Sequence, residues 1–173
     1  DTYVFDKTGT LTKGSFELTA IISEYPEHCL SLAAAAEKNS NHPIAQSLMD
    51  AYAKYSKEVD KQKLVRVKEI PGYGISATYD GKRIHVGNKR LMETYDIDLS
   101  LVKDKSDEFA SVGKTPLYYA LDHQIIGLIV VSDVLKKTSL EAIQALKSLN
   151  KNVIMLTGDN VLTASSIGKQ LGI

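Results

Sequence analysis

Residues 3–12 read YVFDKTGTLT, and the organisation of the chain can be worked out from them. The run from Tyr3 to Phe5 is short and apolar, as a buried strand is, and it stops at the polar residue Asp6. In α/β proteins such a strand delivers polar side chains to its carboxyl end, where binding sites form. We therefore predict a buried strand at residues 3–5 and a functional site that begins at Asp6.

A second strand of this kind lies near the other end of the sequence. The apolar residues 153–156 are followed by the polar loop TGDN at residues 157–160. Before this strand, Thr138 or Ser139 can cap a helix. The apolar face of that helix consists of Leu140, Ile143, Leu146 and Leu149. A helix followed by a strand, after an earlier strand, predicts a parallel sheet.

The residues between these two strands show a different pattern. Residues 27–38 are rich in alanine and favour a helix, and Pro43 is suited to begin a second helix. Strands are predicted at residues 64–70, 75–79, 82–86, 117–121 and 124–131. Asp80-Gly81 closes one hairpin among them. The middle of the chain is therefore expected to be largely antiparallel.

These two patterns fit one arrangement best. We predict a doubly wound α/β domain with a parallel sheet, incomplete in this sequence, that is interrupted by an inserted α+β domain with an antiparallel sheet. The α/β domain takes residues 1–13 and 122–173, and the inserted domain takes residues 14–121.

Composition excludes several functional classes. The 173 residues contain 21 Lys and Arg against 21 Asp and Glu, so a nucleic-acid-binding surface is not indicated. The apolar run at residues 125–131 is far shorter than the roughly 18 residues of a membrane span, which predicts a soluble piece. The single cysteine, Cys29, cannot form an internal disulfide and favours a reducing compartment.

The heptapeptide DKTGTLT at residues 6–12 resembles the phosphorylation sequence of the P-type ATPases. The resemblance implies that Asp6 is the nucleophile that accepts a phosphoryl group from ATP, with Lys7 as a nearby cation and Thr8 as a catalytic neighbour. A carboxylate is chemically suited to this role, because an aspartyl phosphate splits hydrolysis into two easier steps. Asp6 and the Thr8 carbonyl are the expected ligands of Mg²⁺.

The loop at residues 157–160 is similar to the TGDN loop of the same family, which has a haloacid-dehalogenase-like fold. By this resemblance, Thr157 holds the phosphoryl group and Asp159 has a supporting role near the nucleotide. Asp133 and Lys136 stand where the family has an acidic residue followed three positions later by a basic one, at the hinge between the domains.

Residues 40–43 read SNHP, which resembles the S-x-H-P element of the heavy-metal-transporting branch. The resemblance places Glu37, His42, Gly72 and Gly74 in the ATP pocket of the inserted domain. Glutamate can accept a hydrogen bond from an exocyclic amine, and glycines let a ligand approach the backbone. Copper is the best guess for the transported metal, although many copper pumps have Glu where this sequence has Asn41.

The resemblance implies the cytosolic ATP-binding and phosphorylation unit of a heavy-metal pump, which works with ATP, Mg²⁺ and the transmembrane and actuator parts. Residues 160–173 lack the family's GDG-x-ND loop, so the phosphorylation domain is expected to be truncated and a poor ATPase by itself. A haloacid-dehalogenase-type phosphatase and a non-catalytic nucleotide-binding module remain alternatives. Such phosphatases often carry a second Asp two positions after the nucleophile, where this sequence has Thr8.

Overall fold

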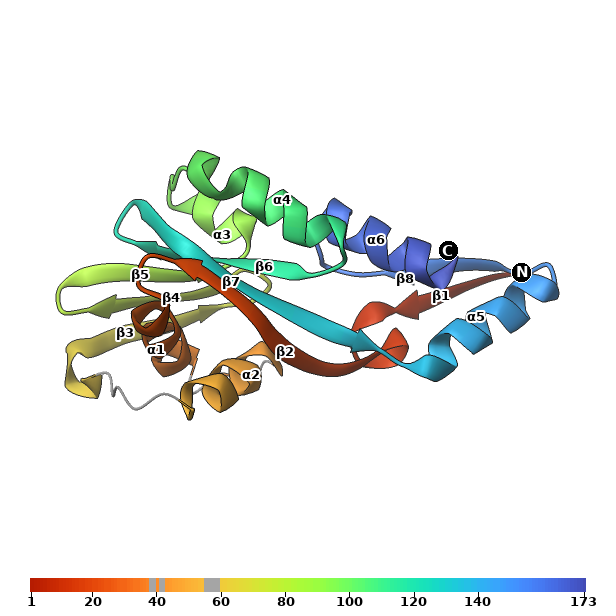
Figure 1. Ribbon diagram of the computed structural model, residues 1–173, viewed down its shortest axis with the longest axis horizontal. Helices are drawn as coiled ribbons and strands as arrows, with labels where there is room; N and C mark the ends of the chain where they lie inside the picture. Colours follow the sequence, from red (N-terminus) through yellow and green to blue (C-terminus); the bar gives the residue numbers. More distant parts are fainter. Residues whose placement is uncertain (38–39, 41–42, 55–59) are drawn as a thin grey trace.

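The computed structural model describes residues 1–37, 40, 43–54 and 60–173. The chain forms an elongated molecule with a large antiparallel sheet at one end and a small parallel sheet at the other (Figure 1). No helix among the described residues is both long enough and apolar enough to cross a membrane. The mixed α/β fold predicted from the sequence is therefore confirmed, with its two kinds of sheet.

The larger sheet has six antiparallel strands. Its spatial order is β2 (Thr12–Ser23), β7 (Gln124–Leu135), β6 (Thr115–Leu121), β5 (Lys82–Gly87), β4 (Gly74–Tyr79) and β3 (Leu64–Ile70). The predicted turn between β4 and β5 is present, and Asp80 and Gly81 both have positive φ values, of 49° and 80°. Two consecutive positive φ values are the signature of the type I′ turns that match the twist of a hairpin.

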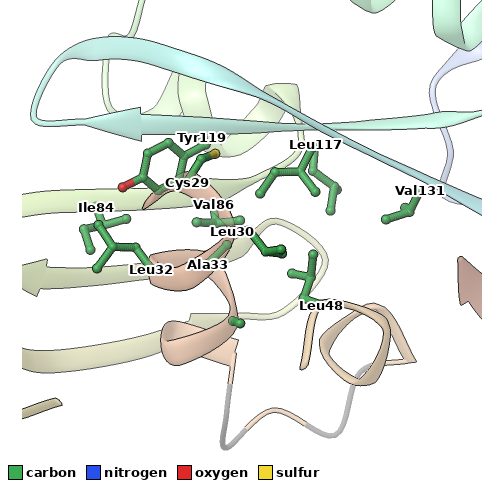
Figure 2. Packing of buried hydrophobic residues seen from close by; sticks show 12 residues of the cluster. Cys29, Leu30, Leu32, Ala33, Leu48, Ile84, Val86, Leu117, Tyr119 and Val131 are labelled. Carbon is green, nitrogen blue, oxygen red and sulfur yellow. The ribbon is translucent and has the colours of Figure 1, made fainter. Parts of the chain in front are cut away.

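Helices cover both faces of this sheet, so its central strands are apolar on both sides. On one face lie α1 (Pro26–Glu37) and α2 (Pro43–Tyr52), whose Leu30 and Leu48 pack against the strands (Figure 2). On the other face lie α3 (Lys89–Thr94) and α4 (Lys103–Ser111). Along β6, Tyr119 faces the first core and Tyr118 the second, as the alternation of side chains in a strand requires.

Two features of this region were not apparent from the sequence. Strand β2 extends over 12 residues for which no strand was predicted. Strand β7 continues to Leu135, beyond the residue 131 that was predicted as its end. The expected domain boundary after residue 121 falls in the turn between β6 and β7, and β7 itself stays in the six-stranded sheet.

The smaller sheet pairs β1 (Thr2–Asp6) with β8 (Asn152–Leu156) in parallel, with Asp6 opposite Leu156. The predicted helix and the strand after it are present as α5 (Lys137–Ser148) and β8, and α6 (Val161–Leu171) follows. A third core forms beneath one face of the sheet. It contains Leu11, Ile143, Ile167 and Leu171, with Phe5, Leu135, Val153 and Met155 packed against them.

The prediction that residues 3–5 form a fully buried strand is wrong. Only Phe5 packs into the third core, whereas Val4 and its partner Ile154 are 59% and 50% exposed. Paired residues of a parallel sheet point to the same face, and the described residues cover only the opposite face.

The predicted cap of α5 is also wrong. The residue that precedes the helix is Lys136, and it makes no side-chain cap. The Ser139 hydroxyl instead donates a hydrogen bond to the Leu11 carbonyl, 2.9 Å away. On the predicted apolar face of this helix, Ile143 is buried but Leu140 and Leu149 are exposed.

The two parts of the molecule meet along two contacts. The strands β2 and β7 run from the large sheet toward the small one, and α4 packs beside α6 (Figure 1). At the second contact, the buried Thr163 hydroxyl on α6 donates a hydrogen bond of 2.7 Å to the Lys114 carbonyl at the end of α4. The loop that follows β1 lies where these two parts join.

Candidate active site

The loop after β1 is a tight turn that leaves its polar residues on the surface. Thr8 has φ −73° and ψ 121°, and Gly9 has φ 80° and ψ −17°. These are the angles of a type II β-turn, whose third residue needs a positive φ and therefore favours glycine. Asp6, Thr8 and Thr10 are all exposed around this turn. The predicted nucleophile thus stands at the end of a strand with its carboxylate open to solvent.

Lys7 has the opposite orientation and is buried. Its side chain is 3% exposed, and Nζ lies 2.8 Å from Oδ2 of Asp159 and 3.8 Å from Oδ2 of Asp133. The short contact with Asp159 is an ion pair rather than an aligned hydrogen bond. The Phe16 ring lies beneath the ammonium group, 5.9 Å from Nζ to the ring centroid. A buried cation needs paired anions of this kind to offset its desolvation. Lys7 therefore links three strand ends: β1, β7 and β8.

Asp133 holds the base of the loop from the opposite strand. Its Oδ2 accepts a hydrogen bond of 2.5 Å from the Thr12 hydroxyl, and its Oδ1 accepts one of 3.2 Å from the Gly14 amide. The sequence assigned Asp133 to an interdomain hinge, and the structure places it in contact with the loop that carries Asp6. Charge-assisted hydrogen bonds such as these are the stronger ones in proteins.

Lys136 approaches the loop from the end of β7. Its Nζ donates a hydrogen bond of 2.9 Å to the Gly9 carbonyl, and its backbone amide donates one of 3.0 Å to the Leu11 carbonyl. Together with Ser139, it satisfies carbonyls that a tight turn would leave without partners. Residues 133–139 therefore clamp the loop from one side.

The TGDN loop lies beside the DKTG loop, because β1 and β8 are paired in parallel and end at the same edge. The Asp159 amide donates to the Thr157 hydroxyl at 3.1 Å, and Asn160 caps α6 by accepting from the Thr163 amide at 2.9 Å. The structure thus brings the loops that carry Asp6, Lys7, Thr8, Thr157 and Asp159 to the same edge of the small sheet. These five residues come from segments about 150 positions apart.

The donors near Asp6 fit Mg²⁺ in kind. An exposed carboxylate at Asp6 and the backbone carbonyl of Thr8 are hard oxygen ligands, which Mg²⁺ prefers, and it commonly keeps several waters as well. The Asp159 carboxylate is already paired with Lys7. Among the described residues, no group of three or more His, Cys, Asp or Glu side chains is placed to hold a metal ion. Asp6 and Thr8 can therefore supply two protein ligands.

The residues expected to bind nucleotide are placed only in part. Gly72 and Gly74 lie at the turn between β3 and β4. Glu37 is the last residue of α1, but its side chain and the whole of His42 lie outside the described part of the chain. The two glycines differ. A Cβ at Gly72 would meet no atom within 4 Å, whereas one at Gly74 would lie 2.2 Å from the Val86 carbonyl oxygen.

Asn88 fixes this turn. Its side-chain amide donates to the Gly72 carbonyl at 2.8 Å, and its Oδ1 accepts from the Leu91 amide at 3.1 Å, which caps α3. A separate cleft of about 450 Å³ lies between β2 and α2, lined among others by Glu17, Ser47 and Asp50. Neither the DKTG loop nor Gly72 lines this cleft.

Sequence reasoning gave no role to Thr12 or Gly14. Thr12 belongs to the quoted heptapeptide, but its partner Asp133 is 121 positions away, so no local pattern indicates that its hydroxyl turns inward. Gly14 was read only as the start of the inserted domain. The available signal was the glycine itself, since glycine commonly occupies positions with a positive φ, which is 70° here.

The family model described as haloacid dehalogenase-like hydrolase matches residues 1–173. Among curated proteins, a copper-exporting P-type ATPase of Staphylococcus haemolyticus is 42% identical over 173 residues, and the match covers all of this chain and 21% of that protein. A copper-exporting P-type ATPase of Staphylococcus epidermidis is 41% identical over 176 residues, with the same shares covered. The chain spans about a fifth of the length of these curated relatives.

Solved structures of ATPases are also similar to this chain. A crystal structure of a zinc-transporting PIB-type ATPase matches 98% of this chain and 28% of its own length, with a TM-score of 0.65 and 28% identity. A catalytic CPx-ATPase domain matches all of this chain and 58% of its own length, with a TM-score of 0.66 and 26% identity. The chain therefore belongs to the haloacid dehalogenase-like hydrolases, and within them it is homologous to the catalytic domain of the heavy-metal P-type ATPases.

Proposed function

We propose that this chain is the ATP-binding and aspartyl-phosphorylation unit of a P-type ATPase that transports a heavy metal, with copper as the metal. The observation that carries the proposal is the meeting of the DKTG loop and the TGD loop, joined by the contact of 2.8 Å between Lys7 and Asp159. The similarity to copper-exporting ATPases along the whole chain supports the choice of metal. The transmembrane and actuator parts of that pump would be its partners, and this unit would lie on the cytosolic side.

In the proposed reaction Asp6 is the nucleophile. One carboxylate oxygen attacks the γ-phosphorus of ATP, a carboxyl–phosphorus bond forms, and the bond from that phosphorus to the bridging oxygen breaks, so that ADP leaves. Water later hydrolyses the aspartyl phosphate and restores the carboxylate. When bound, Mg²⁺ offsets the negative charge of the phosphoryl oxygens. We assign to Thr157 the role of holding the phosphoryl group, and the parallel pairing of β1 and β8, which end at the same edge, supports this assignment.

Within this chain, the proposed role of Lys7 and Asp159 is to hold the two loops of the site in position. The ion pair fixes the TGD loop against the DKTG loop, and the burial of Lys7 keeps its ammonium beneath the turn. Asp6 and Thr8 are the ligands we propose for Mg²⁺. Their exposure at the turn leaves room for the waters and phosphate oxygens that complete an octahedral shell.

The nucleotide is proposed to bind to the inserted unit, through Glu37, His42, Gly72 and Gly74. Gly72 has open space above it and could admit a ligand to the backbone. Gly74 would contribute by giving the turn its shape, because its backbone touches that of β5. The unit takes residues 14–121, and the membership of β7 in the same sheet indicates that this strand folds with it.

A phosphatase of the haloacid-dehalogenase type is the second candidate. Thr8 stands where such an enzyme often has an acid/base Asp, so rapid hydrolysis of the aspartyl phosphate lacks the general base that would take a proton from the attacking water. A pump needs a phosphoenzyme that persists, and the residue at position 8 favours that reading. A nucleotide-binding module without catalysis is the third candidate, and it predicts no covalent phosphate.

Phosphoenzyme formation distinguishes the three candidates. The complete protein that carries this chain is incubated with γ-labelled ATP and Mg²⁺, quenched in acid and assayed for bound label, beside an Asp6→Asn variant. We expect acid-stable label that depends on Asp6, and slow release of phosphate from a small phosphomonoester. Fast turnover of the phosphomonoester would favour the phosphatase, and absent label would favour the binding module. The transported metal is tested in membrane vesicles, where Cu⁺ should increase the amount of bound label more than Zn²⁺ does.

The 173 residues alone are expected to bind ATP but to hydrolyse it slowly, because the described site offers few metal ligands. Replacing Glu37 or His42 by Ala should weaken ATP binding to this chain by about 1–3 kcal/mol if each loses a polar contact. Binding through the base should need no Mg²⁺. If both variants bind ATP with the affinity of the wild type, these two residues do not belong to the ATP pocket.

A further inference from the structure

Thr12 is the most deeply buried polar residue of the active-site loop. Its side chain is 0% exposed, and it lies at the start of β2, directly after the turn that follows Asp6. Its Oγ1 is 2.5 Å from Oδ2 of Asp133, 3.0 Å from the Lys7 carbonyl oxygen and 3.1 Å from the Gly9 amide nitrogen. One hydroxyl therefore touches both ends of the loop and the strand opposite it.

The chemistry of these contacts gives them a direction. A hydroxyl has a single proton, and the closest acceptor is the Asp133 carboxylate, so Thr12 donates there. Its lone pairs are then free to accept from the Gly9 amide. The result is a chain of hydrogen bonds from the Gly9 N–H through the Thr12 O–H to Asp133. Polarisation along such a chain strengthens each bond.

This chain of bonds determines which way the turn faces. Because the Gly9 amide donates to Thr12 and the Gly9 carbonyl accepts from Lys136, both polar groups of the Gly9 backbone are bonded to other residues of the protein. The exposed groups of the turn are then those of its neighbours, Asp6 and Thr8. Rotation of the turn would expose the Gly9 amide and carry the Asp6 carboxylate away from its place beside the TGD loop.

Gly14 supports the same arrangement from behind. Its amide donates to the second oxygen of Asp133, and a Cβ added there would lie 3.1 Å from the Gly9 Cα. The backbones of Gly9 and Gly14 are thus packed against each other, with Asp133 accepting on both of its oxygens. Release of Thr12 would take a hydrogen bond away from this buried carboxylate, which is costly.

We infer that Thr12 is a positioning residue for phosphoryl transfer, which orients the Asp6 turn through the Gly9 amide and the Asp133 carboxylate. This inference rests on the proposed function, in which Asp6 is phosphorylated. Because Thr12 is buried beneath the turn, it is inferred to act through the turn and not by contact with the nucleotide or the phosphoryl group. Its effect is on the orientation of the nucleophile, where a misplacement of about 1 Å can lower a rate by roughly a hundredfold.

The test compares two substitutions at Thr12 in the complete protein. Thr12→Val keeps the shape but removes the hydroxyl, and Thr12→Ser keeps the hydroxyl. Thr19→Val is the matched control, because Thr19 lies on the same strand and donates to the Val130 carbonyl at 3.1 Å, away from the loop. We expect the phosphorylation rate at saturating ATP to fall about 10–100-fold in Thr12→Val, with the KM for ATP unchanged. Thr12→Ser should recover most of the rate, and Thr19→Val should behave as the wild type.

A second measurement follows the bond itself in the 173-residue chain. Amide hydrogen exchange of Gly9 should be faster in Thr12→Val than in the wild type and in Thr12→Ser. The inference is overturned if Thr12→Val phosphorylates Asp6 at the wild-type rate, or if Gly9 exchange is unchanged. It is also overturned if Thr12→Ser is as slow as Thr12→Val. A wild-type protein without Asp6-dependent label would instead overturn the proposed function, and the inference with it.

Discussion

The antiparallel and parallel regions of this chain use their buried side chains differently. The six-stranded sheet is covered on both faces and buries mainly apolar groups, such as Leu30 and Leu128, with a few polar side chains such as His85. Where it joins the small parallel sheet, a polar cluster is buried that consists of Lys7 after β1, Thr12 on β2 and Asp133 on β7. Apolar contacts have no preferred direction, whereas ion pairs and hydrogen bonds fix atoms in place. The apolar layers are therefore suited to stability, and the polar cluster at the join is suited to holding the loop that carries Asp6.

The largest effect should come from removing the buried cation. Lys7→Met leaves Asp159 and Asp133 facing each other without their ammonium, and breaking a buried pair in this way costs about 3–5 kcal/mol. Urea unfolding should show this loss. Lys151→Met is the control, since its ion pair with Asp1 is exposed and should contribute about 1 kcal/mol or less. Equal losses in the two variants would contradict the view that the polar cluster holds the parallel region.

A cavity in the antiparallel core should come next. Leu30→Ala removes a side chain that is 0% exposed, and such changes cost about 2–5 kcal/mol. Leu149→Ala, in the parallel region, removes one that is 66% exposed and should change stability by about 0.5 kcal/mol or less. The two variants are compared by the midpoint of urea unfolding. A large loss for Leu149→Ala would mean that the apolar contribution of the two regions is more even than their burial indicates.

Substitutions at Gly72 and Gly74, in the turn between β3 and β4, should distinguish an effect on stability from an effect on ligand binding. Gly74→Ala forces a Cβ against the Val86 carbonyl and should lower stability by about 1–3 kcal/mol. Gly72→Ala has open space and strains only the backbone, at φ 76°, so its cost should be near 1 kcal/mol. Thermal melting gives the first comparison and ATP titration the second. If Gly72 lies under the nucleotide, its variant should weaken ATP binding more than it weakens the fold.

The smallest expected effect is a pH dependence in the antiparallel region. Burial lowers the pKa of His85, with a further contribution from Arg83, and its ring stacks on Tyr95 at 4.0 Å. A histidine whose pKa is lower in the folded state stabilises the protein above its unfolded pKa of about 6.5, and that contribution is lost as the pH falls below it.

This dependence can be isolated by substitution. His85→Phe should keep the stacking on Tyr95 and reduce the loss of stability between about pH 7 and pH 5. His28→Phe is the control, because His28 is exposed on the same part of the chain. Identical pH profiles for the wild type and His85→Phe, measured by urea unfolding, would show that protonation of the buried ring does not contribute.

Much of the fold could be predicted from the sequence. The β4–β5 hairpin was found from Asp80-Gly81, because that turn needs two positive φ values, which this pair tolerates. The parallel pairing of β1 and β8 followed from the strand, helix and strand order. Strand β2 was missed, although its residues alternate between exposed and half-buried positions from Lys13 to Ala20. Val4 was misjudged, since an apolar run does not reveal whether both faces of a strand are covered.

The candidate site, like the fold, could be predicted from the sequence only in part. A short motif was enough to single out Asp6 and its neighbours, because the type II turn and the proposed nucleophile are encoded in consecutive residues. The inward orientation of Lys7 and Thr12 depends on Asp133 and Asp159, which are more than 120 positions away. Sequence alone therefore determined which residue is proposed to carry a phosphoryl group and where most of the strands lie. The tertiary structure determined which polar groups are buried and paired, since the free energy of burying a charge depends on partners that only folding brings within a few ångströms.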